Sequence, residues 1–130
     1  MKKNNAKEDN WFLHVNYWDP HTPYRVPLQI ENQFKNDPLP EWLTEEVVKK
    51  HQLVVGPHTA REVKMWDSSP YKDYPRQPTE VRNMEDLRNL IDGYDMGIWY
   101  LDTHFGYILE ALQKEGVLDD LIIIISADHG

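Results

Sequence analysis

The chain lacks cysteine, an excess of basic residues and any long apolar run. Without cysteine, these residues cannot form a disulfide, a cysteine-ligated zinc site or a cysteine nucleophile. No apolar stretch approaches the roughly 20 residues that a membrane-spanning helix needs, and residues 1–9 are too polar for a secretory signal. The net charge of -8 offers no basic surface to nucleic acid. We therefore predict no membrane span and no nucleic-acid partner, and we leave the localisation open.

The length of the chain allows a single domain at most. Its 130 residues can bury a modest core, and its apolar fraction of 40% and charged fraction of 28% are ordinary for globular proteins. The last residue, Gly130, comes shortly after an apolar run that has few candidate strands to pair with. We therefore interpret the chain as part of a larger enzyme. The alternative is a small domain with an abrupt end, and the oligomeric state stays open.

The apolar run near the C-terminus carries the first candidate site. Residues 121–125 are all aliphatic, and Ser, Ala, Asp128, His129 and Gly130 follow at once. A short, continuous, β-branched run predicts a strand buried on both faces, as in parallel sheets. Polar groups just past the carboxyl end of such a strand lie where open α/β sheets bind ligands, and carboxylate and imidazole groups can hold a metal or a phosphate-like group. The alternative is a strand followed by an ordinary polar turn.

A second strand candidate with polar residues at its end lies near the N-terminus. Aromatic and β-branched residues dominate positions 11–18, and a loop with Asp19, His21 and three prolines follows. The prolines exclude helix and sheet interior from this loop and make it stiff. His21 and the Asp128–His129 pair are therefore both predicted to follow strands, from which they can reach the same edge of one sheet.

The middle of the chain is irregular and rich in proline. We predict that residues 28–79 form an insertion or a lid, with a surface loop at residues 68–78. A short helix is predicted at residues 41–51, with Trp42, Leu43, Val47 and Val48 on one side and Gly56-Pro57 ending it.

A long helix is predicted at residues 83–115. Apolar residues recur at alternating steps of four and three from Leu87 to Leu112, which is the pattern of one continuous helical stripe. Asn83 is a suitable N-cap and Gly116 a suitable C-terminal stop, while Gly93 or Gly97 marks a place where the helix can kink. We interpret Asp92, Asp95 and Asp102 as a polar flank of this helix.

The order of helix, tight link, buried strand and polar loop predicts the fold class. This order is typical of α/β proteins, in which helices flank a sheet that is wholly or mostly parallel. We therefore predict that residues 1–130 form part of an α/β domain, with a mixed or parallel sheet flanked by helices and incomplete within this chain. Residues 121–130 are predicted to be the strand and loop that carry its candidate site for a metal or a phosphate-like group.

Three segments, in order, resemble a known family. Residues 118–130 are similar to the pattern L-x-D-[NDT]-T-I-[IV]-[IV]-x-[ST]-[SA]-D-H-G, and residues 100–109 to Y-x-D-x-x-[IV]-G-x-[IL]-L. Residues 11–27 resemble a third pattern, which contains P-H-x-P. All three occur in the sulfatases of the alkaline phosphatase superfamily, and the resemblance covers about half of the chain. It implies an alkaline phosphatase-like fold.

The resemblance also implies roles for three residues. Asp128 and His129 match ligands of a divalent cation, usually calcium, and His21 matches a histidine that contacts the sulfate ester. The implied substrate is a small sulfate ester or a sulfated glycan. The family's formylglycine nucleophile derives from a Cys or Ser followed by x-Pro-Ser-Arg, which these residues lack, so we expect it upstream and expect no activity from this segment alone. A phosphate or phosphonate ester hydrolase, or a non-catalytic module, is the alternative.

Overall fold

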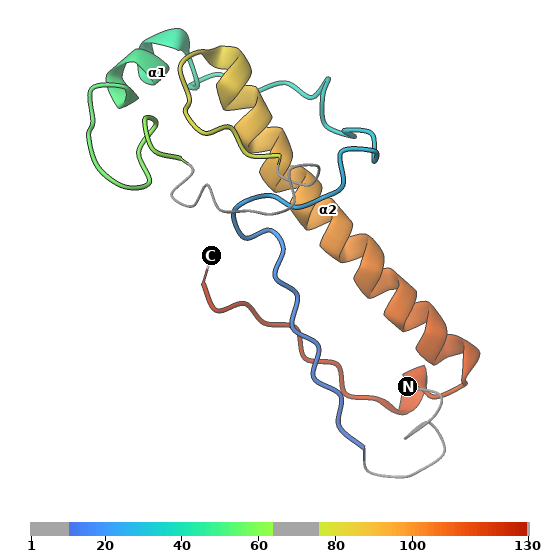
Figure 1. Ribbon diagram of the computed structural model, residues 1–130. Coiled ribbons are helices and arrows are strands. Elements are labelled where there is room, and N and C mark those ends of the chain that lie inside the picture. The colour runs from blue at the N-terminus through green and yellow to red at the C-terminus, as the bar shows by residue number, and fades with distance from the viewer. Residues whose placement is uncertain (1–10, 64–75, 130) are drawn as a thin grey trace. The chain divides into compact units, whose positions relative to one another are not determined.

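The computed structural model describes residues 11–63 and 76–129, which contain two α-helices and one short 3-10 helix. They are α1 (Glu45–His51), α2 (Met84–Lys114) and η1 (Leu118–Asp120) (Figure 1). The chain divides into two compact units, one of Tyr17–Asp102 and one of Met1–Asn16 with Thr103–Gly130. Among the described residues, no helix is both long and apolar enough to cross a membrane.

The long helix α2 confirms the prediction for residues 83–115 almost to the residue. The Asn83 side chain accepts a hydrogen bond from the Asp86 N–H at 2.9 Å, as an N-cap does. At the other end, Gly116 has a φ of 72°. The Gly116 N–H donates to Gln113 O at 3.0 Å and the Val117 N–H to Leu112 O at 3.2 Å. These two bonds form a Schellman motif, which ends the helix where a glycine tolerates the left-handed conformation.

The short helix α1 begins four residues later than the sequence predicted. Thr44 is its N-cap, with the hydroxyl oxygen 3.4 Å from the Val47 N–H. The preceding residues instead form a turn, in which the Leu43 N–H donates to Pro40 O at 2.9 Å. Val48 is buried, whereas Trp42, which precedes the helix, is exposed.

The buried face of α2 in the unit of residues 17–102 differs from the predicted apolar stripe. Tyr94 and Ile98, which belong to the stripe, are 43% and 44% exposed. The buried positions are Asp92, Gly93, Met96 and Gly97. They are buried because the segment of residues 20–33 packs against this face of the helix.

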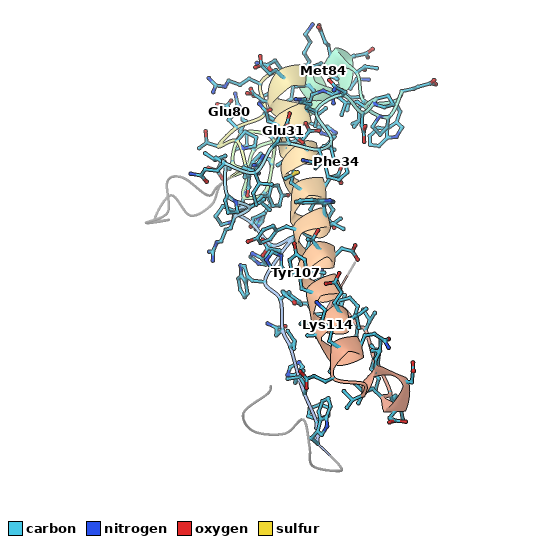
Figure 2. All side chains as sticks on the ribbon, turned by 90° about the vertical axis from the view of Figure 1, so that its right-hand side faces the viewer. Glu31, Phe34, Glu80, Met84, Tyr107 and Lys114 are labelled. Atoms are coloured by element: carbon cyan, nitrogen blue, oxygen red, sulfur yellow. The ribbon has the colours of Figure 1, made fainter. Side chains whose placement is uncertain are left out.

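Irregular segments supply the rest of the core of this unit. Val26 and Met96 are fully buried, and Val81 is nearly so. Figure 2 shows Glu31 and Phe34 beside the N-terminal half of α2, whose first residue is Met84. Within residues 17–63 and 76–102, helix-to-loop contacts therefore replace the helix-to-sheet contacts that the sequence predicted.

The two predicted strands do not form a sheet among the described residues. Residues 11–18 and 121–125 carry no strand assignment. The side chains of Phe12 and Ile122 are 86% and 91% exposed, so the described residues do not confirm the predicted strand buried on both faces. A strand of that kind needs neighbouring strands to pair its backbone and cover its side chains, and the described residues provide none.

The predicted insertion or lid at residues 28–79 stays a prediction. Residues 64–75 lie outside the described residues, and most of the predicted surface loop at 68–78 lies there too. The described parts of the segment are α1 and the irregular residues on either side of it.

Candidate functional site

His21 lies on an exposed loop in the unit of residues 17–102. The backbone N–H of His21 donates to Trp18 O at 2.9 Å. The imidazole ring of His21 and the indole ring of Trp18 have centroids 4.4 Å apart. The ring nitrogen Nδ1 lies 2.6 Å from Thr22 O. Because a carbonyl oxygen can only accept, Nδ1 carries a proton, and Nε2 is the nitrogen left for a ligand. All these contacts are local, so the position of His21 depends on what holds its loop.

Two glycines of α2 lie against the His21 loop, which we define as residues 19–27. A Cβ built on Gly97 would lie 2.9 Å from Pro20 Cβ, and one on Gly93 would lie 2.7 Å from Tyr24 Cδ2 and 2.5 Å from Arg76 O. Real Cβ contacts are longer than this. The helix runs through both glycines as one element (Figure 1). Their role here is close approach of the loop, not the kink that the sequence predicted.

Tyr24 follows His21 by three residues and anchors the same loop. Its side chain is buried, and its ring meets that of Tyr94 edge-on with the centroids 5.9 Å apart. Burial, reinforced by the neighbouring Tyr94 and Asp95, raises the pKa of Tyr24 above its usual value. The phenol therefore stays neutral throughout the physiological range and acts as a packing group.

Arg76 holds the end of the His21 loop and the residues after it through main-chain carbonyls. Its Nε donates to Val26 O at 3.1 Å, its Nη2 donates to Pro27 O at 2.7 Å, and Nη2 also bonds Ile30 O. The Arg76 N–H donates to Tyr24 O at 2.5 Å. Burial lowers the pKa of Arg76, but a guanidinium remains charged at all physiological pH values. The side chain and the backbone N–H of Arg76 thus together hold the chain from residue 24 to residue 30.

Asp92 is a buried anchor, whereas the sequence indicated a polar flank. It is 6% exposed and accepts a hydrogen bond from Asn32 Nδ2 at 2.7 Å. Arg88 Nη1 lies 3.8 Å from its other carboxylate oxygen. One turn further on, burial raises the pKa of Asp95, and the charges of Asp92 and Asp37 add to the effect.

A pocket of about 300 Å³ lies beside Arg76 and Asp92. Its lining residues come from the irregular segments and the N-terminal half of α2: Leu28, Asn32, Arg76, Gln77, Pro78, Asn89, Asp92 and Gly93. None of the three residues that the sequence selected lines this pocket. The pocket and the predicted site residues are therefore separate features.

Asp128 and His129 lie in the other unit, near the end of the apolar run. Their side chains are 92% and 78% exposed, and His129 Nε2 lies 3.9 Å from Asp128 Oδ2. The His129 N–H also donates to Asp128 Oδ1 at 3.1 Å. Among residues 11–63 and 76–129, no group of three or more potential ligands is close enough to hold a metal ion. The pair thus provides one carboxylate and one imidazole, which suit a divalent cation in kind but are too few to enclose one.

The predicted convergence of His21 with Asp128 and His129 stays a prediction. His21 belongs to the unit of residues 17–102, and the other two belong to the second unit. Sequence reasoning missed Arg76, and it assigned a different role to Gly93 and Gly97. The spacing of the two glycines, four apart on a helix, was a usable signal, because such residues share a face and let another backbone approach.

The comparisons with known proteins agree on one family. The family model described as Sulfatase matches residues 1–130. The chain is 26% identical to the iduronate 2-sulfatase of Mus musculus over 140 aligned positions, covering 100% of the chain and 23% of that protein. It is 29% identical to the choline-sulfatase of Rhizobium meliloti over 120 positions, covering 92% of the chain and 21% of that protein. The chain thus spans less than a quarter of each relative.

No solved structure gives a significant match to the chain. The family assignment therefore comes from sequence, and it implies an α/β fold of the alkaline phosphatase type, of which the described residues show the helices and not the sheet. Because the family model covers every residue from Met1 to Gly130, the chain belongs to the sulfatase family.

Proposed function

We propose that the protein is a metal-dependent sulfuric ester hydrolase in which His21 contacts the sulfate ester and Asp128 and His129 bind the metal. The observation that carries this proposal is the match of the sulfatase family to the whole chain. Since the chain spans 23% and 21% of two relatives, we assign the activity to the protein made from its complete reading frame. The nucleophile, formylglycine in this family, would come from outside residues 1–130.

The geometry of His21 supports its role as an anion contact. With Nδ1 bound to Thr22 O, Nε2 is the nitrogen that faces a ligand. A neutral ring can only accept there, whereas the imidazolium donates a hydrogen bond to a sulfate oxygen or gives its proton to the departing alkoxide. The exposure of His21 leaves room for either interaction.

Asp128 and His129 would supply part of a metal site. The carboxylate of Asp128 is a ligand that suits calcium, which takes six to eight oxygens, and the imidazole of His129 adds a nitrogen. We propose calcium as the cation, with its other ligands outside the described residues. When bound, such a cation supplies positive charge beside the sulfate oxygens, where negative charge develops during hydrolysis.

The two relatives support a substrate class but not a single substrate. Their names refer to iduronate 2-sulfate and to choline sulfate, which have different alcohols. The chain resembles both to a similar degree, at 26% and 29% identity. We therefore limit the proposal to sulfate esters of sugars or small alcohols.

Hydrolysis of paired esters tests the reaction. The protein from the complete reading frame is given the sulfate ester and the phosphate ester of the same alcohol, first of a sugar and then of choline. We expect hydrolysis of the sulfate ester, and a loss of about 10²- to 10⁴-fold in kcat/KM for His21→Ala, the range for an acid–base group. The control is His51→Ala, which removes an exposed histidine at the end of α1. Preference for the phosphate ester would identify a phosphate ester hydrolase, and hydrolysis of neither would contradict the proposal.

Calorimetric titration with calcium tests the metal ligands. We expect the same protein to bind calcium and Asp128→Asn to bind it at least tenfold more weakly, because the variant replaces a charged ligand by a neutral one. Asp119→Asn, which alters another exposed aspartate of the same unit, is the matched control. Equal affinity of the Asp128 variant and the unmodified protein would remove Asp128 from the site.

A further inference from the structure

We propose that Gly97 is a positioning residue for His21: with Gly93 it forms a glycine seat on α2 that fixes the His21 loop, and Arg76 holds the loop on this seat. The importance of His21 for activity rests on the proposed function. The seat itself rests on contacts within residues 17–102, which lie in one compact unit.

The His21 loop contacts the seat on both sides of His21. Pro20, one residue before it, lies over Gly97, and Tyr24, three residues after it, lies over Gly93. A methyl group at Gly97 would meet the rigid Pro20 ring at 2.9 Å from its Cβ and 3.0 Å from its Cα. Proline has no rotamer that can swing away, so the loop itself would have to move. His21 would move with it, because its contacts are to Trp18 and Thr22 of the same segment.

Arg76 limits where the loop can go. It bonds the carbonyls of Val26, Pro27 and Ile30, while its N–H bonds Tyr24 O. The Arg76 carbonyl oxygen would lie only 2.5 Å from a Cβ at Gly93. The glycine seat, the loop and Arg76 thus form one packed layer. Displacement at Gly97 reaches His21 through the Pro20 ring and the main chain, and displacement at Gly93 reaches the loop through the Arg76 carbonyl and the Tyr24 ring.

The third interior glycine of α2 provides a matched control. A Cβ at Gly106 has no neighbour within 4 Å. Gly106→Ala therefore makes the same chemical change in the same helix without touching the loop. An effect of Gly97→Ala that Gly106→Ala lacks is thus due to the seat and not to the helix propensity of alanine.

Hydrogen exchange measured by mass spectrometry tests the seat independently of activity. In the full-length protein, Gly97→Ala is expected to speed exchange of the His21 and Ile30 amides, which bond Trp18 O and Pro27 O, by at least tenfold. Gly106→Ala is expected to leave them unchanged. Arg76→Lys, which cannot bond several carbonyls with a planar fork, is a second variant that leaves α2 intact and is expected to speed the same exchange. Unchanged exchange of these amides in both Gly97→Ala and Arg76→Lys would contradict the proposed glycine seat.

Hydrolysis kinetics test positioning. Gly97→Ala is expected to lower kcat/KM for a sulfate ester by about 10- to 100-fold, as small displacements of reacting groups do. In a His21→Ala background the same change is expected to have no further effect, because no imidazole remains to be positioned. Equal losses in both backgrounds, or faster exchange without any loss of activity, would contradict a positioning role. If the unmodified protein hydrolyses no sulfate ester, the proposed function fails, while the exchange measurement still decides whether the seat exists.

Discussion

The Nδ2 of Asn32 donates a hydrogen bond to Oδ2 of Asp92 over 2.7 Å, although the two residues are 60 positions apart in the chain. Asp92 belongs to the buried face of α2, and Asn32 belongs to the irregular segment that covers this face. Nearby, the Gln33 N–H points at Met96 Sδ at 3.4 Å, and Arg88 Nη1 donates to Asp37 O at 2.9 Å. Side chains of α2 thus hold an irregular segment in place.

The Asn32–Asp92 bond predicts a cost in stability when Asp92 is truncated. Asp92→Ala leaves the Asn32 amide without its acceptor in a partly buried place, so the free energy of unfolding is expected to fall by about 1–3 kcal/mol. Urea unfolding followed by circular dichroism measures this loss. Asp102→Ala, at an exposed position of the same helix, is the control and is expected to change stability by under about 0.5 kcal/mol. A similar small change for Asp92→Ala would show that the bond contributes little.

The features that the sequence predicted well depend on neighbours in the chain. Asn83 caps α2 because its side chain reaches an N–H three residues on, and Gly116 ends α2 because a residue without a Cβ adopts a φ of 72° at little cost. The Asp-His-Gly and Pro-His-Thr-Pro motifs are local too, and they led to the correct family. Features that depend only on residues nearby in the chain can therefore be predicted from the sequence.

The features that the sequence predicted badly depend on distant partners. The apolar run at 121–125 is a strand only when other strands pair with it, and none is present among the described residues. The buried face of α2 contains two glycines and an aspartate, which no apolar periodicity detects. Arg76 binds three carbonyls that lie 46 to 50 residues away. Such contacts follow from tertiary packing, so hydropathy patterns do not reveal them.

Two interior glycines of α2, Gly93 and Gly106, are expected to respond in opposite ways to substitution by alanine. Gly106→Ala should raise the free energy of unfolding by up to about 1 kcal/mol, because alanine favours the helix and meets nothing within 4 Å. Gly93→Ala should lower it by about 1–3 kcal/mol, because its methyl group meets Arg76 O and the ring of Tyr24. Thermal unfolding of the two variants and the unmodified protein shows whether each substitution stabilises or destabilises the fold. A gain in stability for Gly93→Ala would contradict the tight packing at that position.

The carboxylate of Asp95 is expected to make stability fall as the pH rises. Burial, then Asp92 and Asp37, raise its pKa in the folded state above its unfolded value. Above the folded-state pKa, the ionised Asp95 carboxylate therefore destabilises the folded state. This destabilisation vanishes below the pKa of the unfolded state, which is about 4. Asp95→Asn should then stabilise the protein at neutral pH and lose this advantage as the pH approaches 3. Urea unfolding at a series of pH values measures the trend, and equal gains at pH 3 and pH 7 would contradict it.

Glu31, on a neighbouring segment, is expected to make stability rise with pH, which is the opposite of the trend expected for Asp95. Its hydrogen bond and ion pair with Lys35, at 2.5 Å, lower its pKa in the folded state. A lowered pKa contributes stability above the unfolded value and loses it as the pH falls through the folded value. Glu31→Gln should therefore be slightly destabilising at neutral pH and neutral at low pH. Since the pair is exposed, added salt should shrink the difference at neutral pH.

The hydrogen bond between His21 Nδ1 and Thr22 O predicts how the activity responds to substitutions at His21. With Nδ1 bound to Thr22 O, Nε2 is the nitrogen that faces the sulfate ester in the proposed function. His21→Gln replaces the ring by an amide, which also carries a hydrogen-bond donor, whereas His21→Ala removes every polar atom of the side chain. We therefore expect His21→Gln to retain more kcat/KM for a sulfate ester than His21→Ala. Steady-state kinetics of the unmodified protein and the two variants make the comparison, and equal losses in both variants would contradict a contribution from hydrogen bonding at this position.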